Sequence, residues 1–203
     1  MHRRKLLPIL YPVLFLLLVI PDVYAQTSED LFNGEVLHAA YLDIAPSDWQ
    51  LLKQNYLANT YYKANLRWVF NGRDIEVRQV GVRSRGTGSR SPVKPGLGID
   101  FSRYDSSQTF LGLKALVLRN NTQDASMMHE AISMPLFRQM GLPASRESYT
   151  RLYINGEYAG LYTFVESVDA AFLNRNFGEN SGYLYSLDRS SAEDPAYLFQ
   201  DLG

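Results

Sequence analysis

Cysteine is absent from this chain of 203 residues, and histidine occurs only three times. Without cysteine the chain cannot form disulfides, use a thiol nucleophile or bind a metal through sulfur. His2, His38 and His129 have no partner at the spacings of zinc sites, so the sequence predicts no metal centre of that kind. Lys and Arg (20) nearly balance Asp and Glu (21), and a net charge of −1 argues against nucleic acid as a principal partner.

Several familiar catalytic patterns are also missing. The chain contains neither GxGxxG nor GxxxxGK[ST], which form phosphate-binding turns, and it lacks the GxSxG elbow of α/β-hydrolases. Internal repeats and low-complexity linkers are absent too. The length therefore fits one domain whose stability depends on packing, and the abundance of Tyr (14) and Phe (10) is typical of a core rich in strands.

The N-terminus has the layout of a secretory signal peptide. The basic residues Arg3, Arg4 and Lys5 precede an apolar run, and Val23-Tyr24-Ala25 place small residues at the −3 and −1 positions of a cleavage site before Gln26. We expect residues 1–25 to be removed, which leaves no stable membrane span and an exported protein in the periplasm, on the cell surface or outside the cell. The alternative is an uncleaved anchor, but the apolar run is shorter than the roughly 20 residues of a span.

Two Asn-Gly pairs predict β-hairpins, because both residues accept the positive φ of a tight turn. Asn71-Gly72 would join strands within residues 61–85, and Asn155-Gly156 would join strands within residues 149–166. Helices are expected after Pro46, from Asp124 to about Met140 with a partly buried Met128, Ile132, Leu136 and Met140 stripe, and over 170–177. Antiparallel pairs with a few helices indicate an α+β fold. Residues 182–187 form a last short strand, and 188–203 are an unpatterned tail.

The glycine-rich loop that follows Arg85 is the first candidate for chemistry. Residues 85–90, RGTGSR, would present backbone N–H groups and guanidinium groups to phosphates, whereas the plainer interpretation is a flexible hairpin tip. Lys94 ends this loop just before a strand. A lysine there would bridge nucleotide phosphates, and a solvated loop lysine is the alternative.

Two glutamates are further candidates. Glu130 lies on the predicted helix among apolar residues, where a buried carboxylate would need a cation such as Lys94; a hydrated position at the helix margin is equally consistent. Glu166 ends a hairpin strand after Phe164 and Val165. It would orient a ligand or a lysine, or else cap the next helix or pair with Arg151 across the hairpin.

From Val80 to about Leu187 the order of motifs resembles the CotH family of atypical secreted protein kinases. The matching segments are VGVRSRGTGS, KPGLGIDF, the stretch from FLGLKALVLRNN to LYINGEYAGLYTFVESVD, FLNRNFG and GYLY. The resemblance implies a fold similar to the N-terminal lobe of a divergent protein kinase over residues 26–187. It also implies phosphorylation of secreted or coat proteins with ATP and Mg²⁺ as cofactors.

By motif, the resemblance assigns nucleotide binding to Lys94, Glu130 and Glu166, with Arg85 in the preceding loop. Gly98 stands where the family commonly has a second basic residue. The metal-binding and catalytic residues of the family belong to a region beyond the GYLY strand, so we expect this chain to be an N-terminal portion without full catalytic machinery. The alternative is a non-catalytic envelope or surface module that binds through Tyr61, Tyr62 and Tyr104.

Overall fold

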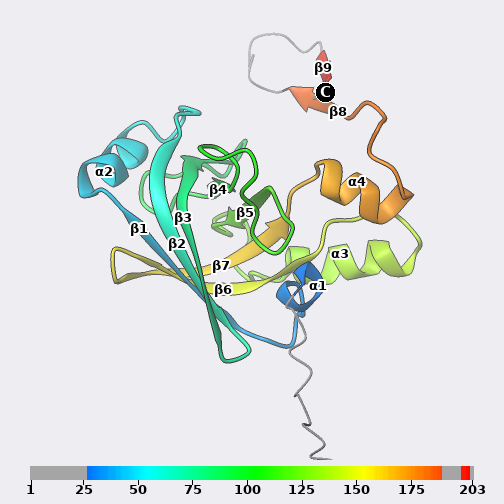
Figure 1. Cartoon of the computed structure of the whole chain (residues 1–203), viewed down its shortest axis with the longest axis horizontal. Coiled ribbons are helices and arrows are strands. Elements are labelled where there is room, and N and C mark those ends of the chain that lie inside the picture. Colours follow the sequence, from blue (N-terminus) through cyan, green and yellow to red (C-terminus); the bar gives the residue numbers. More distant parts are fainter. Residues whose placement is uncertain (1–26, 189–197, 202–203) are drawn as a thin grey trace, which may run out of the picture.

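Seven strands form a closed barrel in the order β1-β2-β3-β4-β5-β7-β6 (Figure 1). The structure is a computed structural model that describes residues 27–188 and 198–201. The barrel strands are β1 (His38–Ile44), β2 (Tyr62–Phe70), β3 (Arg73–Ser84), β4 (Leu97–Asp100), β5 (Ala115–Arg119), β6 (Glu147–Ile154) and β7 (Glu157–Glu166).

The barrel closes at a seam between β1 and β6, its one parallel pair. Residues His38 to Leu42 pair with Thr150 to Ile154, and the Asn155 side chain accepts a hydrogen bond from the Ile44 amide at 2.9 Å. The predicted α+β fold, with its likeness to the N-terminal lobe of a kinase, is therefore wrong. The seam joins segments more than a hundred residues apart, and a pattern of neighbouring hairpins carries no signal for such a pairing.

Both predicted hairpins are confirmed. β2 and β3 meet at Asn71 (φ 50°) and Gly72 (φ 69°), and β6 and β7 meet at Asn155 (φ 50°) and Gly156 (φ 85°). Positive φ at both central positions is the requirement of a primed hairpin turn, which explains why the sequence signal worked.

The described residues form four helices, α1 (Ser28–Leu31), α2 (Pro46–Gln54), α3 (His129–Gln139) and α4 (Ala170–Phe177). α4 has the predicted bounds: the Asp169 carboxylate accepts from the amides of Ala171 and Phe172, and Gly178 ends the helix at φ 74°. These are the usual solutions for the unpaired amides and carbonyls at helix ends.

The expected burial of α3 is wrong. The helix begins at His129, whose amide donates to the Asp124 carboxylate at 2.8 Å, and it buries none of its residues. The predicted stripe faces solvent, with exposed fractions of 50% to 64% for Met128, Ile132, Leu136 and Met140.

The core fills the inside of the barrel. Its largest fully buried side chains include Trp68, Phe101, Phe110, Tyr162 and Phe164. The interior is thus packed by side chains, and any ligand site of the barrel must lie on its outside or at its rim.

The predicted signal peptide, residues 1–25, lies outside the described residues. The last predicted strand is present as β8 (Tyr185–Asp188), which pairs with β9 (Leu198–Asp201) in a separate two-stranded sheet. Within residues 27–188 and 198–201, every helix is too short or too polar to cross a membrane.

Candidate functional site

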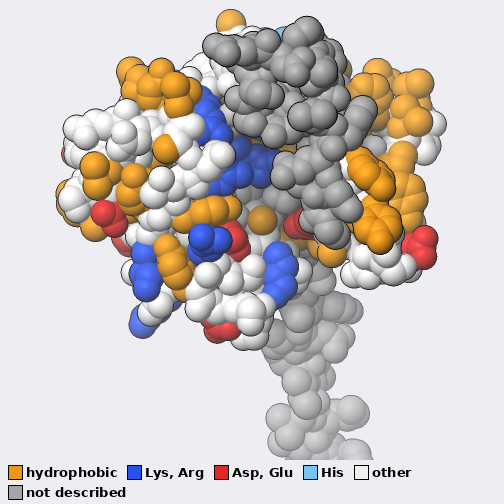
Figure 2. Space-filling model, turned by 90° about the horizontal axis from the view of Figure 1, so that it is seen from above, with side chains coloured by type: hydrophobic (Ala, Val, Ile, Leu, Met, Phe, Trp, Pro, Cys, Tyr) orange, Lys and Arg blue, Asp and Glu red, His pale blue; other side chains and the backbone are white. Residues whose placement is uncertain are grey.

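A basic hollow of about 910 Å³ lies on the outer surface of the barrel. Its floor comes from β3, β5 and β7, and the glycine-rich loop and the segment after α2 form walls. Four arginines line it: Arg83, Arg85, Arg90 and Arg119. Figure 2 shows Lys and Arg side chains gathered near the centre of one face of the molecule. We call this cavity the arginine hollow.

Two of the four arginines hold the wall together. Arg83 donates to the Tyr61 hydroxyl at 3.2 Å and to the Asn59 side-chain oxygen at 3.0 Å. Arg90 donates to the same Asn59 oxygen at 2.6 Å, to the Leu57 carbonyl at 2.6 Å and to the Gly86 carbonyl at 2.7 Å. These guanidinium groups therefore fasten the glycine-rich loop to the segment after α2.

Arg119, the third, is paired with a carboxylate. Its Nε lies 3.2 Å from Glu130 Oε1, which also lines a smaller adjoining cavity of about 150 Å³. This contact supplies the cation that the position of Glu130 was expected to need, but the cation comes from β5 and not from Lys94.

Arg85 differs from the other three. Its guanidinium makes no hydrogen bond or ion pair with the residues that the structure describes, although its backbone amide donates to Gly96 at 2.8 Å. Desolvation by the surrounding walls lowers the pKa of Arg85, and the like charges of Arg83, Arg119 and Arg90 lower it further. A bound anion would relieve this crowding of positive charge.

The loop beside Arg85 also has backbone donors to offer. The amides of Thr87, Gly88 and Ser89 make no hydrogen bond to any part of the chain that is described. All three residues line the arginine hollow. Consecutive free amides beside a guanidinium are suited to phosphate oxygens.

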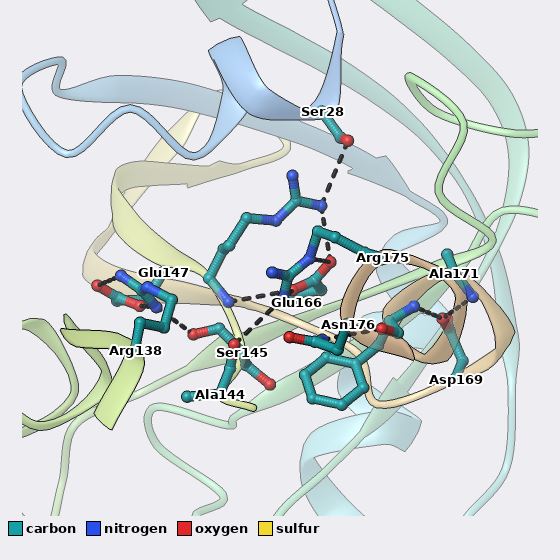
Figure 3. Close-up of polar contacts among 12 residues, drawn as sticks. Ser28, Arg138, Ala144, Ser145, Glu147, Glu166, Asp169, Ala171, Arg175 and Asn176 are labelled. Atoms are coloured by element: carbon teal, nitrogen blue, oxygen red, sulfur yellow. Dashed lines mark hydrogen bonds and ion pairs between the residues drawn. The ribbon is translucent and has the colours of Figure 1, made fainter. Parts of the chain in front are cut away.

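Glu166 lines the hollow but is fully occupied by other contacts. Arg175 of α4 donates to it through Nε at 3.1 Å and Nη2 at 2.5 Å, and Arg146 donates through its backbone amide at 3.1 Å and Nη2 at 2.6 Å (Figure 3). Burial alone would raise the pKa of Glu166, but the hydrogen bonds from Arg175 and Arg146 outweigh it and lower the pKa. The contacts of Glu166 are therefore those of a structural residue, and its partners are Arg175 and Arg146 in place of the expected Arg151.

The Lys94 side chain contacts β7 and is not part of the lining of the arginine hollow. Its ammonium donates to the Leu161 carbonyl at 3.0 Å and lies 4.9 Å from the centre of the Tyr162 ring. Burial lowers the pKa of Lys94. The structure brings Arg85 and Glu166 to one cavity, while Lys94 and Glu130 lie in separate surroundings. Nucleotide binding by Lys94 stays a prediction.

Sequence reasoning missed Arg90, Asn120, Arg146 and Arg175 as organisers of this region. Each acts on a partner at least nine residues away along the chain or on several carbonyls at once. No motif or period marks such contacts.

Two of the three tyrosines of the alternative surface module, Tyr61 and Tyr104, have a cation over the ring. Arg103 lies 4.5 Å from the centre of the Tyr61 ring, and Lys63 lies 4.6 Å from that of Tyr104. Their ring faces are thus partly occupied by cation–π contacts.

The comparison with known proteins agrees with the motif order in the sequence. The family model described as CotH kinase protein matches residues 82–201, which is more than half of the chain. The inner spore coat protein H of Bacillus subtilis (strain 168) is 25% identical over 156 residues, covering 77% of this chain and 41% of that protein. The chain thus spans less than half of that relative. On the family match, the chain belongs to the CotH family.

Proposed function

We propose that this chain binds the phosphates of ATP in the arginine hollow, as the nucleotide-binding part of a CotH-type phosphotransferase. Its substrates would be secreted or coat proteins, in keeping with the name of the spore coat relative. In this proposal, a full-length family protein phosphorylates its substrates with ATP. The described residues would form the site that binds the phosphates.

The observation that carries the proposal is the free guanidinium of Arg85 among three engaged arginines. Arg83 and Arg90 are held by neutral partners, so they add positive potential without competing for the Arg85 position, whereas the charge of Arg119 is offset by Glu130. Charge-assisted hydrogen bonds from Arg to phosphate are short and strong. A triphosphate is the ligand whose charge matches such a cluster.

The position of Gly98 supports the same interpretation. A Cβ built on Gly98 would lie 3.5 Å from Arg85 Cδ and 3.7 Å from Arg83 Cγ. The place where the family commonly has a basic side chain is therefore next to two arginines of this chain. Arg85 would supply the cation that Gly98 lacks.

The floor of the hollow also offers an apolar contact for the base. Val117 and Val165 face each other across β5 and β7, and both line the cavity. Their small exposed area, 8% for Val117 and 3% for Val165, would contact the base while the free amides and the guanidinium bind the phosphates.

Unlike the phosphates of ATP, a magnesium ion has no suitable ligands in the arginine hollow. In the described ranges 27–188 and 198–201, no three His, Asp or Glu side chains converge on a point that would suit a metal ion. Glu166, the carboxylate of the hollow, is saturated by two arginines. No step through a metal is derived for this part of the chain.

Calorimetric titration of the purified protein with ATP tests the proposal. Arg85→Ala should weaken binding by about 10-fold or more, the loss expected for a charged hydrogen-bond donor. Arg78→Ala is the matched control, because Arg78 lies on β3, the strand that precedes Arg85, and its side chain is 80% exposed. An unmutated protein without measurable affinity for ATP would overturn the proposal.

We also infer that the chain acts outside the cytoplasm, on the strength of the N-terminal pattern and the coat relative. N-terminal sequencing of the protein recovered from its host should give Gln26 as the first residue. A protein that retains Met1 and stays inside the cell would contradict this inference.

A further inference from the structure

Asn120 makes two contacts with the glycine-rich loop. It follows β5 directly and is only 3% exposed. Its Nδ2 donates to the Ser89 carbonyl at 2.8 Å and to the Lys94 carbonyl at 2.7 Å. One buried amide group thus uses both of its hydrogens on carbonyls from two parts of the same loop.

The orientation of this amide is fixed from the other side. Asn120 Oδ1 accepts from the Thr122 hydroxyl at 3.2 Å and from the Thr122 backbone amide at 3.4 Å. Two carbonyl acceptors on one side and two donors on the other leave only one assignment of nitrogen and oxygen. The side chain is therefore held in a single, fully used geometry.

A contact within the loop holds its Gly86 end. Arg90 donates to the Gly86 carbonyl at 2.7 Å. A planar trans peptide points its C=O and N–H in opposite directions. Fixing the carbonyls of Gly86 and Ser89 therefore fixes the directions of the next amides, those of Thr87 and Arg90. The free amides of residues 87–89 lie between these two attachments.

From this geometry we propose that Asn120 is a positioning residue for anion binding. It holds the Ser89 end of the loop so that the free amides and Arg85 can bind the same anion. The inference rests on the proposed function, because it concerns the same hollow. It assigns to Asn120 a contribution to affinity without contact with the phosphates.

The test replaces the amide by a group of equal shape. Asn120→Asp removes both N–H donors of Nδ2 and places one carboxylate oxygen against the carbonyls of Ser89 and Lys94. The matched control is Asn121→Asp, which adds the same charge one residue along and removes a bond to the Thr163 hydroxyl and none to the loop. Titration with ATP should show about 10-fold weaker binding for Asn120→Asp than for Asn121→Asp.

Two further measurements separate positioning from general stability. The urea midpoint reports folding, while hydrogen exchange of residues 86–90 reports the loop itself. We expect Asn120→Asp to speed loop exchange and weaken ATP binding even where the protein is fully folded. Equal ATP affinities for the two variants would overturn the inference but leave the proposed function standing, whereas absence of binding in the unmutated protein would overturn the proposed function.

Asn120→Ala covers the case in which a buried carboxylate prevents folding. It removes the same two donors without adding charge, and weaker ATP binding by the folded variant would support the inference. Failure of both variants to fold would contradict it, since Asn120 would then be required for the core and not for the loop.

Discussion

The Arg175 guanidinium donates two hydrogen bonds to the Glu166 carboxylate, from Nε at 3.1 Å and from Nη2 at 2.5 Å. The contact joins the end of β7 to α4 and lies beside the arginine hollow. Arg146, itself 9% exposed at its side chain, shares the carboxylate. Glu166 is thus the common counter-ion of two arginines.

Removing that counter-ion should destabilise the fold. Glu166→Gln would remove the charge partner of Arg175 and leave buried Arg146 with only the exposed Glu29, and breaking a buried pair costs about 3 kcal/mol. Urea denaturation at neutral pH measures the change. Glu157→Gln, at the exposed start of the same strand, is the control and should leave the midpoint unchanged. A midpoint for Glu166→Gln equal to that of the control would contradict the structural role.

Acid should weaken the fold through His38. This side chain is fully buried and accepts from the Trp68 indole at 2.9 Å, and burial lowers its pKa from 6.5 to about 4. Between those values the unfolded chain binds a proton that the folded chain does not. Stability from this source is therefore complete above about pH 6.5 and is lost as the pH falls toward 4, by about 3 kcal/mol in all.

His38→Asn tests this pH dependence, because the amide oxygen replaces the acceptor but does not titrate. Urea midpoints of the variant should change less between pH 7 and pH 5 than those of the unmutated protein. His129→Asn is the control, since the His129 side chain is 74% exposed. An unaltered pH slope in His38→Asn would refute the assignment to His38.

Lys94→Met should separate the lysine's structural contact from ligand binding. Loss of the hydrogen bond to the Leu161 carbonyl should cost about 1 kcal/mol of folding free energy. Affinity for ATP should stay within about threefold, because the ammonium is directed at the barrel wall. A loss of affinity as large as that of Arg85→Ala would instead make Lys94 a phosphate ligand, as the family resemblance predicts.

The pair of Arg119 and Glu130 is the contact that ties the first turn of α3 to β5. A double-mutant cycle with Arg119→Ala and Glu130→Ala should give a coupling of about 0.5–1 kcal/mol, since Arg119 is half exposed. Thermal unfolding of the four proteins measures it. Additive effects would mean that the contact contributes nothing to stability.

Local chemistry decided which features the sequence could predict. The turns at Asn71-Gly72 and Asn155-Gly156 and the caps of α4 depend on residues next to one another, and their signals were correct. The exposed stripe of α3 was misread because an apolar period indicates a helix but does not show what covers it.

The barrel and the hollow depend on distant residues. Closure needs β1 beside β6, and the hollow needs Arg90 to reach carbonyls 32 or more residues earlier in the chain. The sequence gives no sign that these distant residues meet. Arg85 was identified from its glycine-rich surroundings, but its isolation from counter-ions required the three-dimensional arrangement of its neighbours.

Because of the parallel seam, the barrel can close only after β6 has been synthesised. One edge of β1 stays open until synthesis has passed Ile154, because its neighbour on that side is β6. An open strand edge invites pairing with other chains. Refolding should therefore be slow compared with that of proteins built from local contacts, and nascent chains halted before Ile154 should aggregate through this edge.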